Sequence, residues 1–132
     1  MIDEKYPYSV PLNFAVKLKP DSTISLYFHG ANAGKKISLL RKNPHVSFAM
    51  SCSRKIVEGI PDCQSTMKYE SVCGTGKVTF LGESDLNEKC LALSEIMKHH
   101  FPNNNHTFSA KEAEMVAILR LDVDEVTGKR NI

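Results

Sequence analysis

Residues 27–36 read Tyr27-Phe28-His29-Gly30-Ala31-Asn32-Ala33-Gly34-Lys35-Lys36, the end of a predicted strand, a turn and the start of a predicted helix. The first amides of a helix have no partners within it, and the helix dipole favours negative charge there. Gly30 and Gly34 let the backbone approach a bound group closely, and Lys35 and Lys36 add positive charge. The segment therefore predicts a phosphate-binding turn. A plain strand-to-helix turn with solvated lysines is the alternative.

This turn differs from a nucleotide-binding P-loop in two respects. A P-loop has four residues between its glycines and a Ser or Thr after its lysine to hold magnesium. Here three residues separate Gly30 from Gly34, and Lys36 stands at the hydroxyl position. The sequence thus predicts a phosphate site without a magnesium ligand.

Composition limits the class of protein and its partners. The 132 residues suffice for a single domain over residues 1–132, and the net charge of +2 is spread along the chain. We therefore expect no nucleic-acid partner and no membrane partner. No apolar run approaches the roughly 20 residues of a membrane span, and the N-terminus does not resemble a signal peptide.

Cysteine spacing indicates a cytoplasmic protein with reduced thiols. The four cysteines form no C-x-x-C pair: Cys52, Cys63, Cys73 and Cys90. A zinc site using His99 and His100 is disfavoured, because adjacent helical residues point about 100° apart and no paired cysteines accompany them.

The segment Tyr6–Lys19 alternates between apolar and polar residues and predicts one long strand. Its apolar face would run from Tyr6 to Leu18 through Leu12 and Phe14. Pro11 lies in the middle, where it cannot donate a ladder hydrogen bond. We expect the strand to open there and to leave backbone groups near Leu12 and Asn13 free for a ligand.

Further elements follow from periodicity and capping residues. A strand with Ile24, Leu26 and Phe28 towards the core precedes the turn, which would leave Tyr27 and His29 on the other face. We expect helices over 33–42, about 85–100 and 109–114, and strands over 45–57, 67–81 and 116–126. In the second helix, Leu86, Cys90, Leu93 and Met97 would form the apolar stripe. A register shift near Gly74 and Gly76 indicates a bulge.

Long alternating strands with short connections favour a mainly β fold with flanking helices, in which an antiparallel sheet curls into a small barrel. Four segments, in this order, also resemble one family: Tyr6-Pro7-Tyr8-Ser9-Val10-Pro11-Leu12 ("YPYVVPL"), Phe28–Lys36 (F-H-x-A-x-x-G-x-K), Tyr69-Glu70-Ser71-Val72 before Gly74, and Thr127-Gly128-Lys129. They are similar to the 5-nitroimidazole-resistance (Nim) proteins of the pyridoxamine 5′-phosphate oxidase-like group. That resemblance implies an antiparallel Greek-key split β-barrel of the FMN-binding type.

The same resemblance implies about thirty more N-terminal residues in most members of that family, which hold a helix and a first barrel strand. Met1-Ile2-Asp3-Glu4 would be the end of that first strand, so we expect either a truncated sequence or a barrel that lacks the helix and the first strand. A missing strand would leave an exposed edge beside Tyr6–Leu18. A partner or a distorted sheet edge would cover it.

The resemblance also implies a site for FMN at a homodimer interface. Lys36 would bind the phosphate with help from Lys35, beside Gly34, and His29, Gly30 and Ala31 would lie against the phosphate or ribityl chain. Backbone groups of Pro11, Leu12 and Asn13 would reach the isoalloxazine edge. Tyr69 and Ser71 would come from a single strand, of the same or the other subunit. His29 is the expected proton donor, because histidine changes charge near neutral pH.

The implied activity is that of an FMN-dependent oxidoreductase, which reduces 5-nitroimidazole-like nitroaromatics or other small-molecule oxidants. The flavin would carry the chemistry, and no nucleophile–base pair is evident in the sequence. A non-catalytic flavin-binding, flavin-storing or ligand-sensing module needs the same phosphate site. A barrel that binds another phosphorylated ligand or a haem-related compound is a third reading.

Overall fold

The computed structural model describes residues 1–132. Five strands form one antiparallel sheet in the order β1-β2-β5-β4-β3. Their bounds are β1 Ala15–Leu18, β2 Ile24–Gly30, β3 His45–Val57, β4 Thr66–Phe80 and β5 Ala117–Asn131. The helices are α1 Lys35–Lys42, α2 Leu86–His100 and α3 Ala110–Glu114, and short 3₁₀ turns lie at Asp62–Gln64 and Glu83–Asp85. This confirms the predicted mainly β, antiparallel fold with flanking helices.

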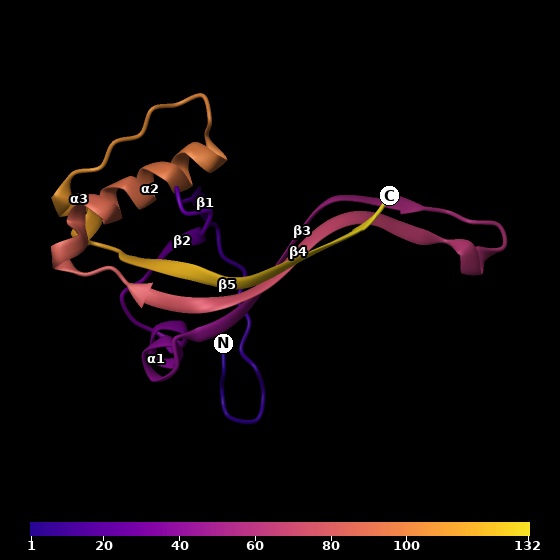
Figure 1. The fold of residues 1–132 in the computed structure, drawn as a ribbon, viewed down its shortest axis with the longest axis horizontal. Helices are drawn as coiled ribbons and strands as arrows, with labels where there is room; N and C mark the ends of the chain where they lie inside the picture. The colour runs from indigo at the N-terminus through magenta and orange to yellow at the C-terminus, as the bar shows by residue number, and fades with distance from the viewer.

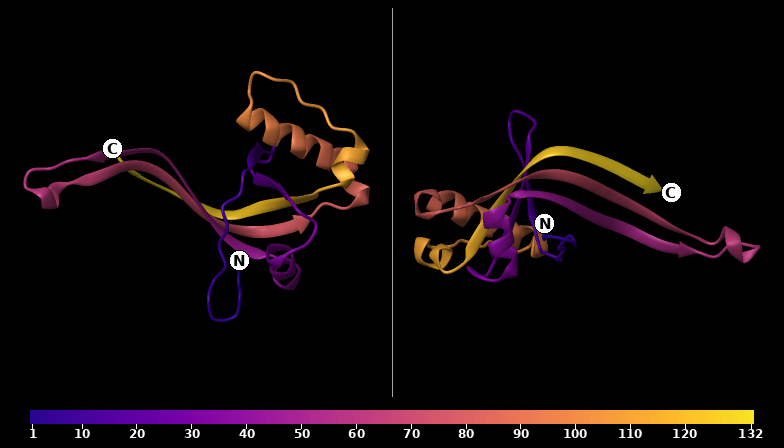
Figure 2. Two further views of the ribbon diagram at one scale, coloured as in Figure 1. Left: turned by 180° about the vertical axis from the view of Figure 1, so that it is seen from behind. Right: turned by 90° about the horizontal axis from the view of Figure 1, so that it is seen from below.

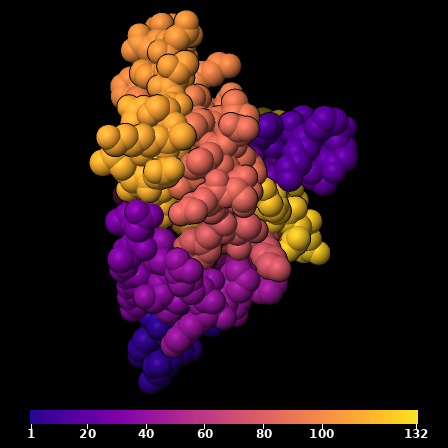
Figure 3. All heavy atoms as spheres, turned by 90° about the vertical axis from the view of Figure 1, so that its left-hand side faces the viewer, coloured from indigo at the N-terminus to yellow at the C-terminus, as the bar shows by residue number.

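The sheet is covered on both faces at one end and is bare at the other (Figure 1). At the covered end, α2 and α3 lie over one face and α1 lies beyond the other. The remaining halves of β3, β4 and β5 extend away from this body as a curved arm, visible also in Figure 2. We define the arm as residues 50–73 and 126–132. Figure 3 shows the covered end, where atoms from the N-terminal, middle and C-terminal parts of the chain lie side by side.

Two apolar clusters pack against opposite faces of the sheet. The first joins Tyr27 and Ile118 to Ala92 and Ile96 of α2. The second joins Leu26, Leu119 and Leu121 to Leu40 of α1 and Val78 of β4. Both faces of β2 are therefore buried, because Tyr27 packs against α2 while Leu26 packs against α1. Leu26 faces the core as predicted, whereas the burial of Tyr27 on the other face was not expected.

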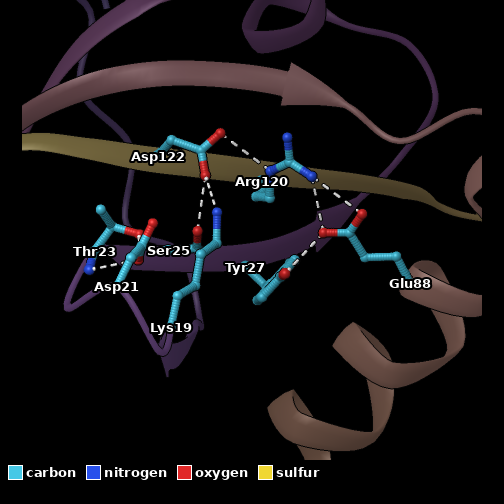
Figure 4. A network of polar contacts seen from close by, with 8 residues as sticks. All are labelled: Lys19, Asp21, Thr23, Ser25, Tyr27, Glu88, Arg120 and Asp122. Carbon is cyan, nitrogen blue, oxygen red and sulfur yellow. Dashed lines mark hydrogen bonds and ion pairs between the residues drawn. The ribbon is translucent and has the colours of Figure 1, made fainter.

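A chain of hydrogen bonds ties α2 to the sheet beside the first cluster (Figure 4). Glu88 accepts from the Tyr27 hydroxyl at 2.8 Å and from Arg120 Nη1 at 2.9 and 3.1 Å. Arg120 Nε also donates to Asp122 Oδ2 at 3.1 Å. Desolvation, together with the Glu88 carboxylate, raises the pKa of Tyr27 to about 12. The hydrogen bonds to Glu88 likewise raise the pKa of Arg120. At neutral pH Tyr27 thus stays a donor and Arg120 a cation.

The predicted long strand over Tyr6–Lys19 is wrong. Only Ala15–Leu18 pairs with β2, and the preceding residues fold back, with hydrogen bonds in both directions between Met1 and Tyr8. The predicted face is also reversed within β1: Ala15 is buried, whereas Val16 and Leu18 are 49% and 69% exposed. Alternation indicates an extended chain, but a strand also needs a partner, and β1 has one only from residue 15 onward.

The other predicted elements are confirmed with shifted ends. β3 has the predicted bounds, and Ser109 caps α3 through a reciprocal capping box with Glu112. β5 runs five residues further than residue 126, to Asn131. The predicted bulge lies between Thr75 and Gly76, where the unpaired residue is Asp124 of β5. The predicted α2 stripe is confirmed at Leu93, which is buried, and at Cys90, which packs against the first cluster; the buried face also includes Lys89, Ala92 and Ile96.

The barrel is not closed, because β1 and β3 are both edge strands without a partner on one side. The expected open edge beside β1 is therefore present, and β3 forms a second one. A bulge between Cys52 and Lys55, where Ser53 has a φ of 54°, distorts the outer half of that edge. None of the helices is long and apolar enough to cross a membrane.

Candidate functional site

The turn between β2 and α1 brings Lys36 over Gly30. A Cβ atom built on Gly30 would lie 2.8 Å from Lys36 Nζ, so the ammonium group occupies the space that a side chain would take. Lys36 is half-buried and forms no ion pair in the structure. A cation held against backbone without an acidic partner is suited to an anionic ligand.

The start of α1 adds free donors to this turn. No side chain caps the helix, and its first turn contains no acidic residue. The first backbone bond of the turn runs from Ser38 N to Gly34 O, so the amides of Lys35, Lys36 and Ile37 have no acceptor. Gly34 has a φ of 117° and a ψ of 177°, a conformation essentially restricted to glycine. The sequence-predicted turn and helix start thus have the geometry of an anion site.

Lys35 is occupied elsewhere. Its Nζ lies 2.7 Å from Asp3 Oδ2 and 4.9 Å from the centre of the Tyr8 ring. The hydrogen bond to Asp3 raises the pKa of Lys35. The folded-back N-terminal segment therefore holds Lys35, and of the two lysines only Lys36 is unpaired.

Lys36 also lines a cavity of about 490 Å³ between the N-terminal segment and β3. Most of its lining is apolar and comes from the second cluster and from Phe48 and Met50 of β3. Pro11 and Leu12 form part of its wall, and Asn13 does not. We call this space the apolar cavity. Its volume lies within the usual range for small-molecule and cofactor sites.

A second cavity, of about 710 Å³, lies over the start of the arm. It shares Phe14, Met50 and Ser51 with the apolar cavity, so the two adjoin. Ser71, His99 and Arg130 also line it. We call it the arm cavity.

The remaining predicted site residues do not gather around Lys36. His29 is exposed and lines neither cavity. Strand alternation places it on the face opposite Phe28 and Gly30, and so opposite Lys36. Ala31 is exposed beside Gly30 in the turn.

Tyr69 and Ser71 lie on the arm, where they pair in register with Asn131 and Lys129. At about 3.3 Å per residue, Ser71 is roughly 20 Å along β4 from Lys77, at the α1 end. The structure therefore brings Gly30, Gly34 and Lys36 together with Pro11 and Leu12, and separates these from Tyr69 and Ser71.

Sequence reasoning missed several cavity residues. Phe48 and Met50 of β3 line the apolar cavity and were not singled out, and Phe14 was expected only as one apolar position in a longer strand. His99, whose ring centre is 5.3 Å from that of Phe14, was considered only as a zinc ligand. No group of three or more His, Cys, Asp or Glu side chains is arranged to hold a metal ion. Spacing along the chain carries no signal for such residues, because they meet only after folding.

Comparison with known protein families gives a match over residues 1–130 to the family described as pyridoxamine 5′-phosphate oxidase. The chain belongs to the pyridoxamine 5′-phosphate oxidase-like family. A solved structure of a candidate 5-nitroimidazole antibiotic resistance protein from Bacteroides thetaiotaomicron shares 34% identity, with a TM-score of 0.75. The match covers 95% of this chain and 69% of that one.

Two solved structures of lower sequence identity show the same fold as this chain. An FAD- and haem-binding protein from Mycobacterium smegmatis has a TM-score of 0.80 at 16% identity, over 98% of this chain and 62% of its own. An FAD-binding protein from Mesorhizobium loti has a TM-score of 0.66 at 22% identity, over 99% and 82%. A search of curated proteins found no match. The family and its split-barrel fold, both expected from the sequence, are confirmed.

Proposed function

We propose that this protein binds FMN at the turn between β2 and α1 and acts as a flavin-dependent reductase of nitroaromatic or other small oxidants. One observation carries the proposal: the unpaired ammonium of Lys36 lies over Gly30, beside the free amides of α1, at the wall of an apolar cavity. A phosphate attached to a large planar ring system fits this combination of a small anion site and an apolar space.

Different residues of the chain would bind different parts of the cofactor. Lys36 and the α1 amides would hold the phosphate, and Gly30 and Gly34 keep the backbone open to it, with Ala31 beside them. Residues 9–14 form no strand in the structure, so the carbonyl groups of Pro11, Leu12 and Asn13 are free of strand pairing and can reach the ring edge. When bound, the flavin supplies hydride or electron transfer, and the protein supplies position and electrostatics.

The relatives support a flavin without fixing which one. The Bacteroides thetaiotaomicron protein is described by its candidate role in 5-nitroimidazole resistance, and the Mesorhizobium loti protein as FAD-binding. We favour FMN because a single unpaired lysine at one helix start matches one phosphate group.

A spectrum of the purified protein tests the cofactor. We expect a yellow protein that releases FMN, identified by mass, on denaturation. A colourless protein that does not bind added FMN would refute the proposal and favour another phosphorylated ligand. NAD(P)H-driven reduction of a nitroimidazole, with and without FMN, then tests catalysis. Tight flavin binding without turnover would favour the storage or sensing module.

His29 is proposed as a proton donor only on the family resemblance, because it lies outside both cavities. The variant His29→Ala tests this role: reduced turnover with unchanged flavin affinity would support it. Unchanged turnover would exclude His29 and direct attention to His99, the histidine that lines the arm cavity.

We also propose a homodimer in the cytoplasm. The arm leaves large apolar side chains in water, with Ile56 78% exposed and Ile60 94% exposed. A second copy that covers the arm would bury them and could bring Tyr69 and Ser71 to the other subunit's cofactor. The unpaired cysteines suit a reducing compartment.

A further inference from the structure

The floor of the arm cavity consists of two rungs of the sheet that face the same side, separated by the rung of Ser51, Ser71 and Lys129. Residues two apart along a strand point to the same face, so both rungs face the same space. Each rung takes one residue from each strand, and all of them line the cavity: Met50, Val72 and Gly128 in one rung, and Cys52, Glu70 and Arg130 in the other.

Gly128 leaves a depression in this floor. A Cβ atom built there would meet only the Ser71 carbonyl oxygen, at 3.9 Å, which is an ordinary contact. Its φ lies outside the region that favours glycine, so the backbone accepts a side chain. A larger residue at this position would therefore extend into the cavity without straining the strand.

The positive charge of Arg130 has no ion-pair partner. Arg130 lines the cavity on the face of Gly128, whereas the side chain of Lys129, one residue earlier, points to the opposite face. Glu70 is the register partner of Arg130, but its Oε2 accepts from Ser53 Oγ at 3.4 Å and does not reach the guanidinium. His99 lines the cavity from the last turn of α2, where a ring N–H can donate to an anion.

We propose that the arm cavity binds the oxyanion, a carboxylate or a phosphate, of the small aromatic compound that reacts at the flavin. A guanidinium such as that of Arg130 can bind either group through two parallel hydrogen bonds. Phe14 and Met50 offer apolar surface to the ring, and both also line the apolar cavity. The role as reactant rests on the proposed function, whereas binding of the anion does not.

Calorimetric titration of the purified full-length chain, with and without added FMN, tests binding directly. Benzoate and benzamide have the same shape and differ in charge. We expect benzoate to bind roughly tenfold more tightly or better, and its affinity to fall with salt. Phenyl phosphate separates the two sources of the oxyanion: tighter binding of either probe supports the site and names the group. Equal affinity for benzoate and benzamide, with no binding of phenyl phosphate, overturns the proposal.

Variants test which side chains bind the anionic probe. Arg130→Gln is expected to weaken binding of the preferred probe about tenfold, and Glu70→Gln to strengthen it by removing the nearby negative charge. Lys68→Gln is the matched control, because it removes one positive charge from the same arm outside the cavity. Gly128→Leu should abolish binding while the circular dichroism spectrum is unchanged. An unchanged affinity in Arg130→Gln, or an equal loss in Lys68→Gln, overturns the assignment. If FMN fails to bind while the anion binds, only the flavin proposal fails.

Discussion

Lys35 and Lys36 are neighbours of equal charge, and their contacts predict different roles. Lys36→Gln should weaken FMN binding about tenfold or more, because a hydrogen bond to a charged group contributes about 1.5–3 kcal/mol. Lys35→Gln loses its pairing with Asp3, an exposed ion pair, and should change the affinity less than about threefold. Quenching of flavin fluorescence on titration measures both. Equal losses in the two variants would contradict the assignment of the phosphate to Lys36.

Gly34 is constrained by its backbone and not by its neighbours. No atom lies within 4 Å of a Cβ built there, but its φ of 117° is unfavourable for any other residue. Gly34→Ala should therefore lower the free energy of unfolding by about 1–3 kcal/mol, measured by urea denaturation. Gly82→Ala is the control: its φ is −97°, so we expect no loss of stability. A neutral Gly34→Ala would show that the turn adopts another conformation.

At the scale of the elements, Asp122 links β5 to β2 and to the β1–β2 turn. Burial acts to raise its pKa, but hydrogen bonds from Ser25 and Lys19 and the charge of Arg120 outweigh burial and lower it below 3.8. A carboxyl group whose pKa is lower in the folded state stabilises the fold at pH values above its pKa in the unfolded state. This stabilisation is lost as the pH falls through its pKa in the folded state. The free energy of unfolding should therefore differ less between about pH 6 and about pH 3 in Asp122→Asn than in the wild type. An identical difference would mean that Asp122 contributes nothing to acid sensitivity.

Sequence patterns predicted the elements better than their pairing. β3 and the capped helix α3 follow from alternation and from Ser109 with Glu112, which are local signals. The strand over residues 6–14 failed because its partner depends on the whole fold. The α2 stripe was predicted in part: Leu93 is buried as expected, but Lys89 was missed, because a lysine that buries its aliphatic chain does not count in an apolar pattern.

The part of the candidate site formed by residues close together in the sequence could be predicted, and the cavities could not. Gly30, Gly34 and Lys36 lie within seven residues of one another, so their spacing alone predicts a phosphate-binding turn. The cavities combine the N-terminal segment with β3, α2 and β5, which are far apart along the chain. His99 and Arg130 could not be assigned from spacing, and Lys129 was recognised only as part of a resembling motif without a role.

At the scale of the molecule, the body and the arm differ in how they bury apolar surface. The body buries its apolar residues between the sheet and the helices, whereas the arm has three strands and no cover. Three strands without a layer on either face cannot exclude water from both. The arm also carries Lys55 directly opposite Lys68, an unfavourable cross-strand pair of like charges. Such an arm needs a second surface to pack against, which is the physical basis of the proposed dimer.

Ile56 and Met67 are register partners on one face of the arm, 78% and 44% exposed. If this face is buried between two copies, Ile56→Ser should shift the dimer towards monomer, because each buried isoleucine side chain contributes about 1.5–3 kcal/mol and the dimer contains two. Sedimentation velocity over a range of concentrations measures the shift. Lys55→Ser, the adjacent residue on the opposite face of the same strand, should leave the dimer intact. A monomeric wild type, or an equal effect of both variants, would contradict an interface on this face and leave the exposed arm without its proposed partner.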